Sequence, residues 1–294
     1  MNWPRDDAKL DRVRALMAEQ ELDALVVRAP DNVLYLTNFW GMKGYDAVVF
    51  PREGEPVLVC LEASEADAER MRLANEISAR AMEHVQQVIR PGMRESEIGA
   101  IWNGWVHDHG TGFEGKVELA HGFSLVWSGE GIRTFTATGS HPIQEHEPTL
   151  FEIWVCADGY WCDHTKNLVP GELTERYAEL EQQLLGVYVA AVDFCRPGAS
   201  LAELDRMVRE GLAELGYPGQ PSHPICHGVG ARAHEPPYAH QAGGGTVEAG
   251  MVLALEPGVY WPEGGGLRVE DNFLVTDAAP ERLCRFPDGI VRTS

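Results

Sequence analysis

The residues best suited to chemistry lie near the end of the chain. His227, Glu256 and Glu270 stand among glycines, prolines and short apolar runs. Residues 252–255 predict a short strand that ends at Glu256, and a turn at 262–266 predicts a return strand that carries Glu270. A hairpin would bring these strand ends together, so one imidazole and two carboxylates could form a hard, mixed nitrogen–oxygen metal site. The alternative is that both glutamates are solvated rim residues of an antiparallel hairpin.

A second pair of carboxylates is predicted on an earlier hairpin. Two apolar segments, 150–157 and 160–168, flank an Asp-Gly dipeptide, which is the strongest local signal for a two-residue hairpin loop. This loop would place Asp163 opposite Trp154 and on the same face as Glu152. Together with the two later glutamates, these side chains make four carboxylates that would repel one another unless cations lie between them. Two divalent ions would neutralise their charge.

The elements that must position these residues are repeated along the chain. An Arg-Pro-Gly helix stop occurs at residue 90 and again at residue 196, each time between two helical patterns and ahead of a β-rich segment. The expected helices are 65–88, 95–107, 174–194 and 201–215. We therefore predict an α+β fold in which two helix–helix–sheet halves are related by a pseudo-twofold axis.

The first part of the chain forms a separate prediction. Residues 1–68 are expected to be a small α/β domain, and residues 69–294 the larger duplicated domain. The elements expected in the small domain are a helix at 7–21 and strands at 25–27, 33–36, 47–50 and 56–61. Its residue types indicate packing or subunit contact.

Composition excludes several classes of protein. Lys and Arg number 24 against 45 Asp and Glu, a net charge of −21 over 294 residues, with no basic stripe for nucleic acid. No apolar run approaches the length of a membrane span, and the first ten residues are polar, unlike a signal peptide. The six cysteines have neither zinc-knuckle spacing nor disulfide-scaffold density. We expect a cytoplasmic protein with reduced thiols.

Three motifs carry a resemblance to a known family. They are His227-Gly-Val-Gly with His234-Glu-Pro-Pro, then Glu256-Pro-Gly-Val-Tyr, then Arg268-Val-Glu-Asp. They resemble the pita-bread metallohydrolases, which include Xaa-Pro aminopeptidase, proline dipeptidase, methionine aminopeptidase and creatinase. The resemblance covers about residues 72–294 and implies the pita-bread fold. The first 65 residues resemble a shortened creatinase/prolidase N-terminal domain.

The resemblance implies a metal-ligand set. The ligands would be Glu152, Asp163, His227, Glu256 and Glu270. It also implies two divalent ions, Mn²⁺ first, with Fe, Co or Zn as alternatives. Two positions depart from the family pattern: Glu152 stands where the family has an aspartate, and Lys166 stands where it usually has arginine. The longer Glu152 side chain could shift one ion or favour a single one.

The same resemblance implies catalytic roles and a partner. Glu256 would take a proton from the attacking water, His234 would hold the substrate, and Arg268 would orient a ligand carboxylate. His141 is the nearest candidate for the substrate-binding histidine that the family places upstream of the first ligand. The implied reaction is amide hydrolysis in a small, Xaa-Pro dipeptide-like substrate by a homodimer.

Two other functions stay open at this point. One is a creatinase-like enzyme that hydrolyses a non-peptide C–N bond, or a lyase, acting on a small amino-acid derivative. The other is a catalytically silent binding protein with the same fold. Retention of four unaltered ligands argues against the binding protein, because a binder does not need clustered carboxylates.

Overall fold

The computed structural model describes residues 7–28, 30–37, 47–59, 65–133, 136–241 and 245–293. Contacts divide the chain into two compact units, Met1–Glu62 and Ala63–Ser294, which are described separately. None of the described helices is long and apolar enough to cross a membrane.

The N-terminal unit contains a three-stranded antiparallel sheet with two helices. Its elements are α1 (Asp7–Glu19), β1 (Ala24–Val27), α2 (Pro30–Thr37), β2 (Ala47–Pro51) and β3 (Val57–Val59), in the sheet order β1-β2-β3. The strand expected at 33–36 is wrong, because these residues belong to α2. Pro30 suits the first helical position, and Val33 and Leu36, three residues apart, are both buried on one side of the helix. Residues 60 and 61 of the last expected strand lie outside the described residues.

The first half of the C-terminal unit packs two helices on a four-stranded sheet. Its elements are α3 (Glu65–Val88), α4 (Glu95–Gly110), the 3₁₀ turns η1 (Phe113–Gly115) and η2 (Gly129–Gly131), and the strands β4 (Ala120–Ser128), β5 (Thr149–Ala157) and β6 (Tyr160–Pro170). The final strand of the chain, β14 (Ile290–Thr293), pairs in parallel with β6, so the sheet order is β14-β6-β5-β4.

The hairpin between β5 and β6 has the predicted register. Asp158 and Gly159 both have positive φ, 49° and 95°, as a two-residue hairpin loop requires. Trp154 lies opposite Asp163, as expected from the sequence.

The second half repeats the arrangement with shorter strands. Its elements are α5 (Glu175–Phe194), α6 (Leu201–Glu214), β7 (Cys226–Gly228), β8 (Glu235–Tyr238), β9 (Val252–Leu255), β10 (Gly258–Tyr260), β11 (Gly266–Arg268), β12 (Asp271–Leu274) and β13 (Glu281–Arg282). The expected return strand is divided at Glu270, because β11 pairs with β10 whereas β12 pairs with β9. The larger sheet has the order β13-β12-β9-β7-β8.

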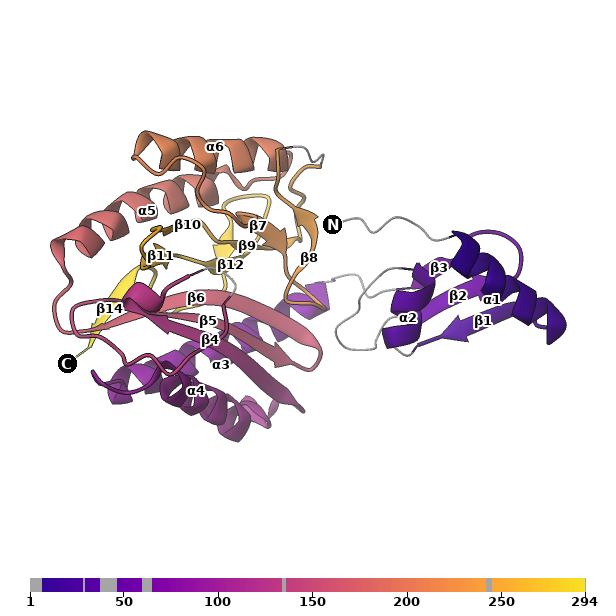
Figure 1. Cartoon of the computed structure of the whole chain (residues 1–294), viewed down its shortest axis with the longest axis horizontal. Helices are drawn as coiled ribbons and strands as arrows, with labels where there is room; N and C mark the ends of the chain where they lie inside the picture. Colours follow the sequence, from indigo (N-terminus) through magenta and orange to yellow (C-terminus); the bar gives the residue numbers. More distant parts are fainter. Residues whose placement is uncertain are drawn as a thin grey trace. The chain divides into compact units, whose positions relative to one another are not determined.

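Each helix pair covers its own half of the strands. In Figure 1, α3 and α4 lie beside β4–β6, and α5 and α6 lie on the opposite side of the unit, beyond β7–β12. The apolar residues accordingly form two main cores, one between α3, α4 and the first sheet and one between α5, α6 and the second. The predicted α+β fold with two helix–helix–sheet halves is confirmed.

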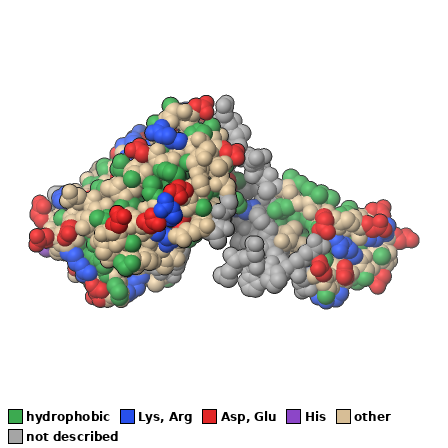
Figure 2. Space-filling view, turned by 90° about the horizontal axis from the view of Figure 1, so that it is seen from above, with side chains coloured by type: hydrophobic (Ala, Val, Ile, Leu, Met, Phe, Trp, Pro, Cys, Tyr) green, Lys and Arg blue, Asp and Glu red, His purple; other side chains and the backbone are tan. Residues whose placement is uncertain are grey.

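Acidic and basic side chains are mixed on the surface. On the face shown in Figure 2, the Lys and Arg side chains of the described residues lie singly or beside acidic ones and form no basic stripe. Surface ion pairs among the described residues include Arg285 with Glu76 and Arg72 with Glu281.

Candidate metal centre

The five predicted ligands come together between the two sheets. Glu152 lies on β5, Asp163 on β6 and His227 on β7, while Glu256 directly follows β9 and Glu270 separates β11 from β12. Three overlapping groups each have ligand atoms within 4.8 Å of one another. They are Glu152, Asp163 and Glu270; His227, Glu256 and Glu270; and Asp163, His227 and His234. The shared members make these groups a single cluster.

A seam of side-chain hydrogen bonds joins β6 to the segment 268–272. The Asn272 side chain accepts from the N–H of Asp163 (2.9 Å) and donates to its carbonyl oxygen (2.8 Å). Two residues further along β6, the Thr165 hydroxyl donates to Glu270 Oε2 (2.7 Å). Another two residues along, the Asn167 side-chain amide donates to the carbonyl oxygen of Arg268 (2.9 Å). As the residue number rises along β6, the number of its partner in the segment 268–272 falls, so the two run antiparallel. This antiparallel seam sets Asp163 and Glu270 side by side.

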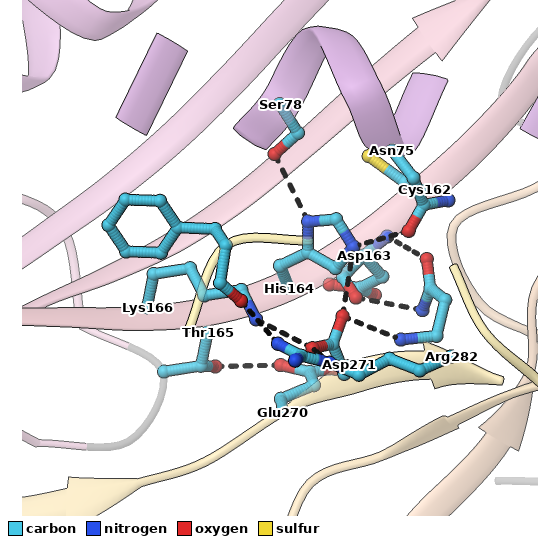
Figure 3. A network of polar contacts seen from close by, with 12 residues as sticks. Asn75, Ser78, Cys162, Asp163, His164, Thr165, Lys166, Glu270, Asp271 and Arg282 are labelled. Atoms are coloured by element: carbon cyan, nitrogen blue, oxygen red, sulfur yellow. Dashed lines mark hydrogen bonds and ion pairs between the residues drawn. The ribbon is translucent and has the colours of Figure 1, made fainter. Parts of the chain in front are cut away.

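A buried ionic network lies behind the seam (Figure 3). Asp271 accepts from Lys166 Nζ at 2.8 Å and from Arg282 Nε at 2.6 Å, and both Asp271 and Lys166 are buried. Burial opposes ionisation of Asp271, but Lys166, His164 and Arg282 together outweigh it and hold the pKa of that carboxyl below its usual value. Asp288 contacts the same two cations, so the two positive and two negative charges balance. The network ties β6 to β12 on the side away from the ligands.

Several buried polar atoms of the cluster have no hydrogen-bond partner among the described residues. They are Oδ1 of Asp163, Oε1 of Glu270 and Nε2 of His227. Leaving such atoms unpaired in a protein interior costs free energy, and native structures rarely do so without a bound ion or water. Anionic oxygens with one imidazole nitrogen are the donors that first-row divalent metals accept. These residues therefore fit a divalent metal site.

The imidazole of His227 is held in the form a metal requires. Its Nδ1 lies 2.9 Å from the carbonyl oxygen of Gly228 and donates to it, which leaves the Nε2 lone pair free. Nε2 lies 3.5 Å from Glu256 Oε1 and 3.7 Å from Asp163 Oδ2. Burial lowers the pKa of His227 to about 4, so the ring is neutral at pH 7.

The glutamates are protonated more readily than usual. Burial raises the pKa of Glu270 to about 8, and the Asp163 charge adds to this. Burial, followed by the charges of Glu270 and Asp163, raises the pKa of Glu256 well above its ordinary value. In the metal-free protein these groups hold protons that bound cations would displace.

This gives a pH prediction for the metal-free protein. A carboxyl with a raised folded-state pKa stabilises the fold below its unfolded pKa and loses that contribution as pH rises through the folded value. We expect chelator-treated protein to lose stability from pH 6.5 to pH 8, on the order of 1 kcal/mol per pH unit from Glu270. His227 and His223 oppose this only weakly, because a histidine of the unfolded chain, with its ordinary pKa of 6.5, has only the last half of its proton to lose above pH 6.5. Urea unfolding at pH 6.5 and 8, with and without Mn²⁺, measures the effect. Equal loss in both series would contradict it.

Arg268 and Glu152 lie against each other at one side of the cluster. The buried Arg268 guanidinium forms an ion pair with the Glu152 carboxylate, and its Nε lies 3.7 Å from Glu270 Oε2. Nε also donates to the Thr165 hydroxyl (2.6 Å), and Nη1 donates to the Tyr260 hydroxyl (3.0 Å). These contacts fix the guanidinium beside two of the predicted ligands.

His234 lies at the open side of the cluster. Its side chain is 47% exposed, and its Nε2 lies 3.1 Å from Asp163 Oδ2. Burial lowers the pKa of His234, but the Asp163 and Glu270 carboxylates together outweigh burial and raise it overall. Its ring centroid is 4.2 Å from that of His227. Of the charged and histidine side chains that line the cavity among the described residues, His234 is the most exposed.

His223 is a neighbour of the cluster that sequence reasoning missed. It is buried, with Nε2 3.0 Å from the Tyr260 hydroxyl and Nδ1 3.3 Å from Glu256 Oε2. Burial lowers its pKa to about 4, so it is neutral at pH 7. Its position four residues before His227 was the one available signal, and it is weak because Pro224 intervenes.

The structure does not bring His141 to this cluster. Its main-chain carbonyl accepts from the N–H of Glu95 (3.0 Å) at the start of α4. The buried Glu95 carboxylate in turn accepts from the N–H groups of Ser128 and Gly139. His141 therefore lies in the loop that Glu95 anchors.

A cavity of about 450 Å³ opens onto the cluster. Its polar floor is formed by Glu152, His227, His234, Glu256 and Arg268. Its described wall is apolar and consists of Leu125, Trp127, Trp154, Pro224 and Tyr238. The volume suits a small organic ligand.

Comparison with known proteins agrees with this geometry. The model of Metallopeptidase family M24 matches residues 69–277, most of the chain and all of the cluster. The chain belongs to this family. In this M24 protein, residues 9–124 also match the Creatinase/Prolidase N-terminal domain.

The relatives of the M24 chain are distant. Several uncharacterized peptidases of Staphylococcus aureus are 26% identical to it over 223 residues, which is 76% of this chain and 62% of the relative. The chain thus spans less than two thirds of the length of these curated relatives.

Solved structures confirm the fold of the M24 chain. The prolidase from Pyrococcus horikoshii OT3 matches with a TM-score of 0.73 at 21% identity, over 95% of this chain and 99% of that one. The X-Pro aminopeptidase from Thermotoga maritima MSB8 matches with a TM-score of 0.74 at 19% identity, over 96% of this chain and 99% of that one. The pita-bread fold predicted from the sequence is confirmed.

Proposed function

We propose that this protein is a metal-dependent hydrolase that cleaves the amide bond of a small, Xaa-Pro dipeptide-like substrate. The observation that carries the proposal is the convergence of Asp163, His227 and Glu270, whose buried donor atoms lack hydrogen-bond partners among the described residues. The chain's membership of a metallopeptidase family supports it. So do the names of its structural neighbours, a prolidase and an X-Pro aminopeptidase.

The ligand assignment starts from the two groups of the cluster that contain Glu270. We propose that Glu152, Asp163 and Glu270 hold one divalent ion, and that Asp163, His227, Glu256 and Glu270 hold a second, with Mn²⁺ the first choice. When bound, such ions supply Lewis-acid activation of water and of the amide carbonyl.

The chain's own residues supply proton transfer and orientation. Glu256, whose raised pKa suits a proton carrier, takes the water proton and passes it to the leaving nitrogen. His234 is half-exposed beside Asp163, where it can donate to the substrate carbonyl. Arg268 keeps Glu152 and Glu270 oriented through its ion pairs.

Calorimetric titration of chelator-treated protein with Mn²⁺ tests the metal assignment. We expect about two ions per chain, and we expect Asp163→Asn to weaken binding at least about tenfold, because Asp163 is a proposed ligand of both ions. Release of proline from Xaa-Pro dipeptides by the loaded protein tests the activity. Absence of Mn²⁺ binding would contradict the proposal of a metal-dependent hydrolase.

The Glu152–Arg268 ion pair favours a second candidate function. A carboxylate already paired with a guanidinium is a weaker metal ligand, which suits a creatinase-like hydrolase or lyase that works on a non-peptide C–N bond without the full metal set. Binding of one ion or none, with no proline release, would favour this candidate.

We also propose a cytoplasmic homodimer. The five cysteines among the described residues are unpaired, which suits a reducing compartment. The dimer rests on the resemblance to the family, and light scattering of the full chain tests it.

A further inference from the structure

A chain of neighbouring aromatic rings runs from Phe123, beside the cavity, through Trp154, His234 and the buried His227 to Tyr238. Phe123 stacks on Trp154 at 5.3 Å between ring centroids, and Trp154 meets His234 edge-on at 6.4 Å. His234 contacts His227, which in turn lies 6.3 Å from Tyr238. The outer ends are open to solvent, since Phe123 is 54% and Tyr238 39% exposed. We call these five residues the aromatic strip.

The sheet itself places the aromatic strip beside the ligands. Trp154 follows Glu152 by two residues on β5, so strand alternation puts both side chains on one face. Trp154 also lies opposite Asp163 on β6 and opposite Phe123 on β4. The position of the Trp154 ring relative to the cluster therefore depends on strand register and not on a loop.

The strip offers apolar area and little charge. Among the described residues that line the cavity, the one arginine is Arg268, and it is already held by Glu152 and Thr165. Leu125 and Trp127 continue the apolar wall along β4. Exposed aromatic rings that rim a cavity are typical of ligand-binding surfaces, because covering them removes apolar area from water.

The strip and the proposed reaction centre meet at His234. This imidazole lies 3.1 Å from Asp163 and is also in edge contact with Trp154. A substrate whose carbonyl reaches His234 and the cluster would carry its neighbouring side chain past the Trp154 ring. In an Xaa-Pro substrate, the variable side chain on that carbonyl belongs to Xaa.

We propose that the aromatic strip selects substrates in which Xaa is a large apolar residue, aromatic above all, with Trp154 as the main specificity determinant. This inference rests on the proposed function, because it concerns the same site. Full burial of a large apolar side chain is worth at least about a tenfold difference in binding, which sets the size of the expected effect.

The test compares kcat/KM for Phe-Pro, Leu-Pro and Gly-Pro with the full-length, Mn²⁺-loaded protein. We expect Phe-Pro to exceed Gly-Pro at least about tenfold. Trp154→Ala should abolish this ratio, mainly through KM for Phe-Pro, whereas Trp154→Phe should keep most of it. Trp105→Ala is the matched control, since Trp105 stacks on His109 of α4, outside the cavity lining. Equal rates for Phe-Pro and Gly-Pro, or a ratio unchanged by Trp154→Ala, would overturn the proposal.

A binding measurement separates this inference from the proposed function. If no Xaa-Pro dipeptide is cleaved, the proposed function fails, and the strip is then tested by calorimetry with L-phenylalaninamide and glycinamide. Tighter binding of L-phenylalaninamide that is lost in Trp154→Ala supports the strip as an apolar-residue site. Equal or absent binding of the two amides overturns it.

Discussion

Replacing Glu256 by glutamine is expected to lower kcat by about 10²–10⁴-fold while the protein stays folded, because general acid–base groups contribute that much to a reaction. Glutamine keeps the shape of the side chain but cannot accept a proton at neutral pH. The pKa of Glu256 is raised by burial and by Glu270 and Asp163, which equips it to hold a proton between two steps. Proline release from a dipeptide, measured at saturating Mn²⁺, gives the size of the effect.

The matched control is Glu248→Gln, since Glu248 is an exposed glutamate outside the cluster. Its rate should stay within about twofold of the unaltered protein, as is usual for surface substitutions. Circular dichroism and the urea midpoint show whether the Glu256 variant is folded. Activity that survives in a folded Glu256→Gln protein would contradict the role assigned to this carboxylate.

Replacing Lys166 by methionine is expected to lower the free energy of unfolding by about 3 kcal/mol. Removing one partner of a buried ion pair costs about 3–5 kcal/mol, and the smaller value applies because Arg282 still contacts Asp271. Since Lys166 and Asp271 tie β6 to β12, Mn²⁺ affinity should also fall by about 10–100-fold, as it does when groups behind metal ligands are lost. Urea unfolding and calorimetric titration measure the two effects.

Lys116→Met is the matched control, because it removes one lysine charge at the surface and leaves the buried network intact. Lys116 is a half-exposed lysine whose Nζ lies 3.7 Å from Glu114, and such surface pairs contribute about 0–1 kcal/mol. Lys166→Arg, which restores the residue usual in the family, should recover most of the stability and the metal affinity. A stability loss in Lys166→Met no larger than in Lys116→Met would show that the network does not support the site.

Much of the site follows from local sequence rules. The Asp-Gly loop determines the register of β5 and β6, and strand alternation then places Glu152, Trp154 and Asp163 on one face. The glycine- and proline-rich motifs around His227 and Glu256 indicated the remaining ligands. The predicted register of β5 and β6 is confirmed, because it depends on residues only a few positions apart, where backbone geometry leaves few alternatives.

Other features depend on tertiary contacts and could not be predicted from the sequence. The strand expected at 33–36 is a helix, in which packing of Val33 and Leu36 on one buried side outweighs the β propensity of Val33. The seam from Asn272 to Asp163 joins residues 109 positions apart, and the bond from Arg268 to Thr165 joins residues 103 apart. No spacing rule reaches that far.

The sequence by itself therefore predicted which residues to test as metal ligands and which strands, or strand ends, carry them. The tertiary structure decided what surrounds them: neutral His223 against Glu256, Arg268 paired with Glu152, and Lys166 balanced by Asp271. The physical reason is that strand register is a local property of the backbone. The charge, protonation and hydrogen bonding of a buried side chain depend instead on whichever distant residues the fold brings against it.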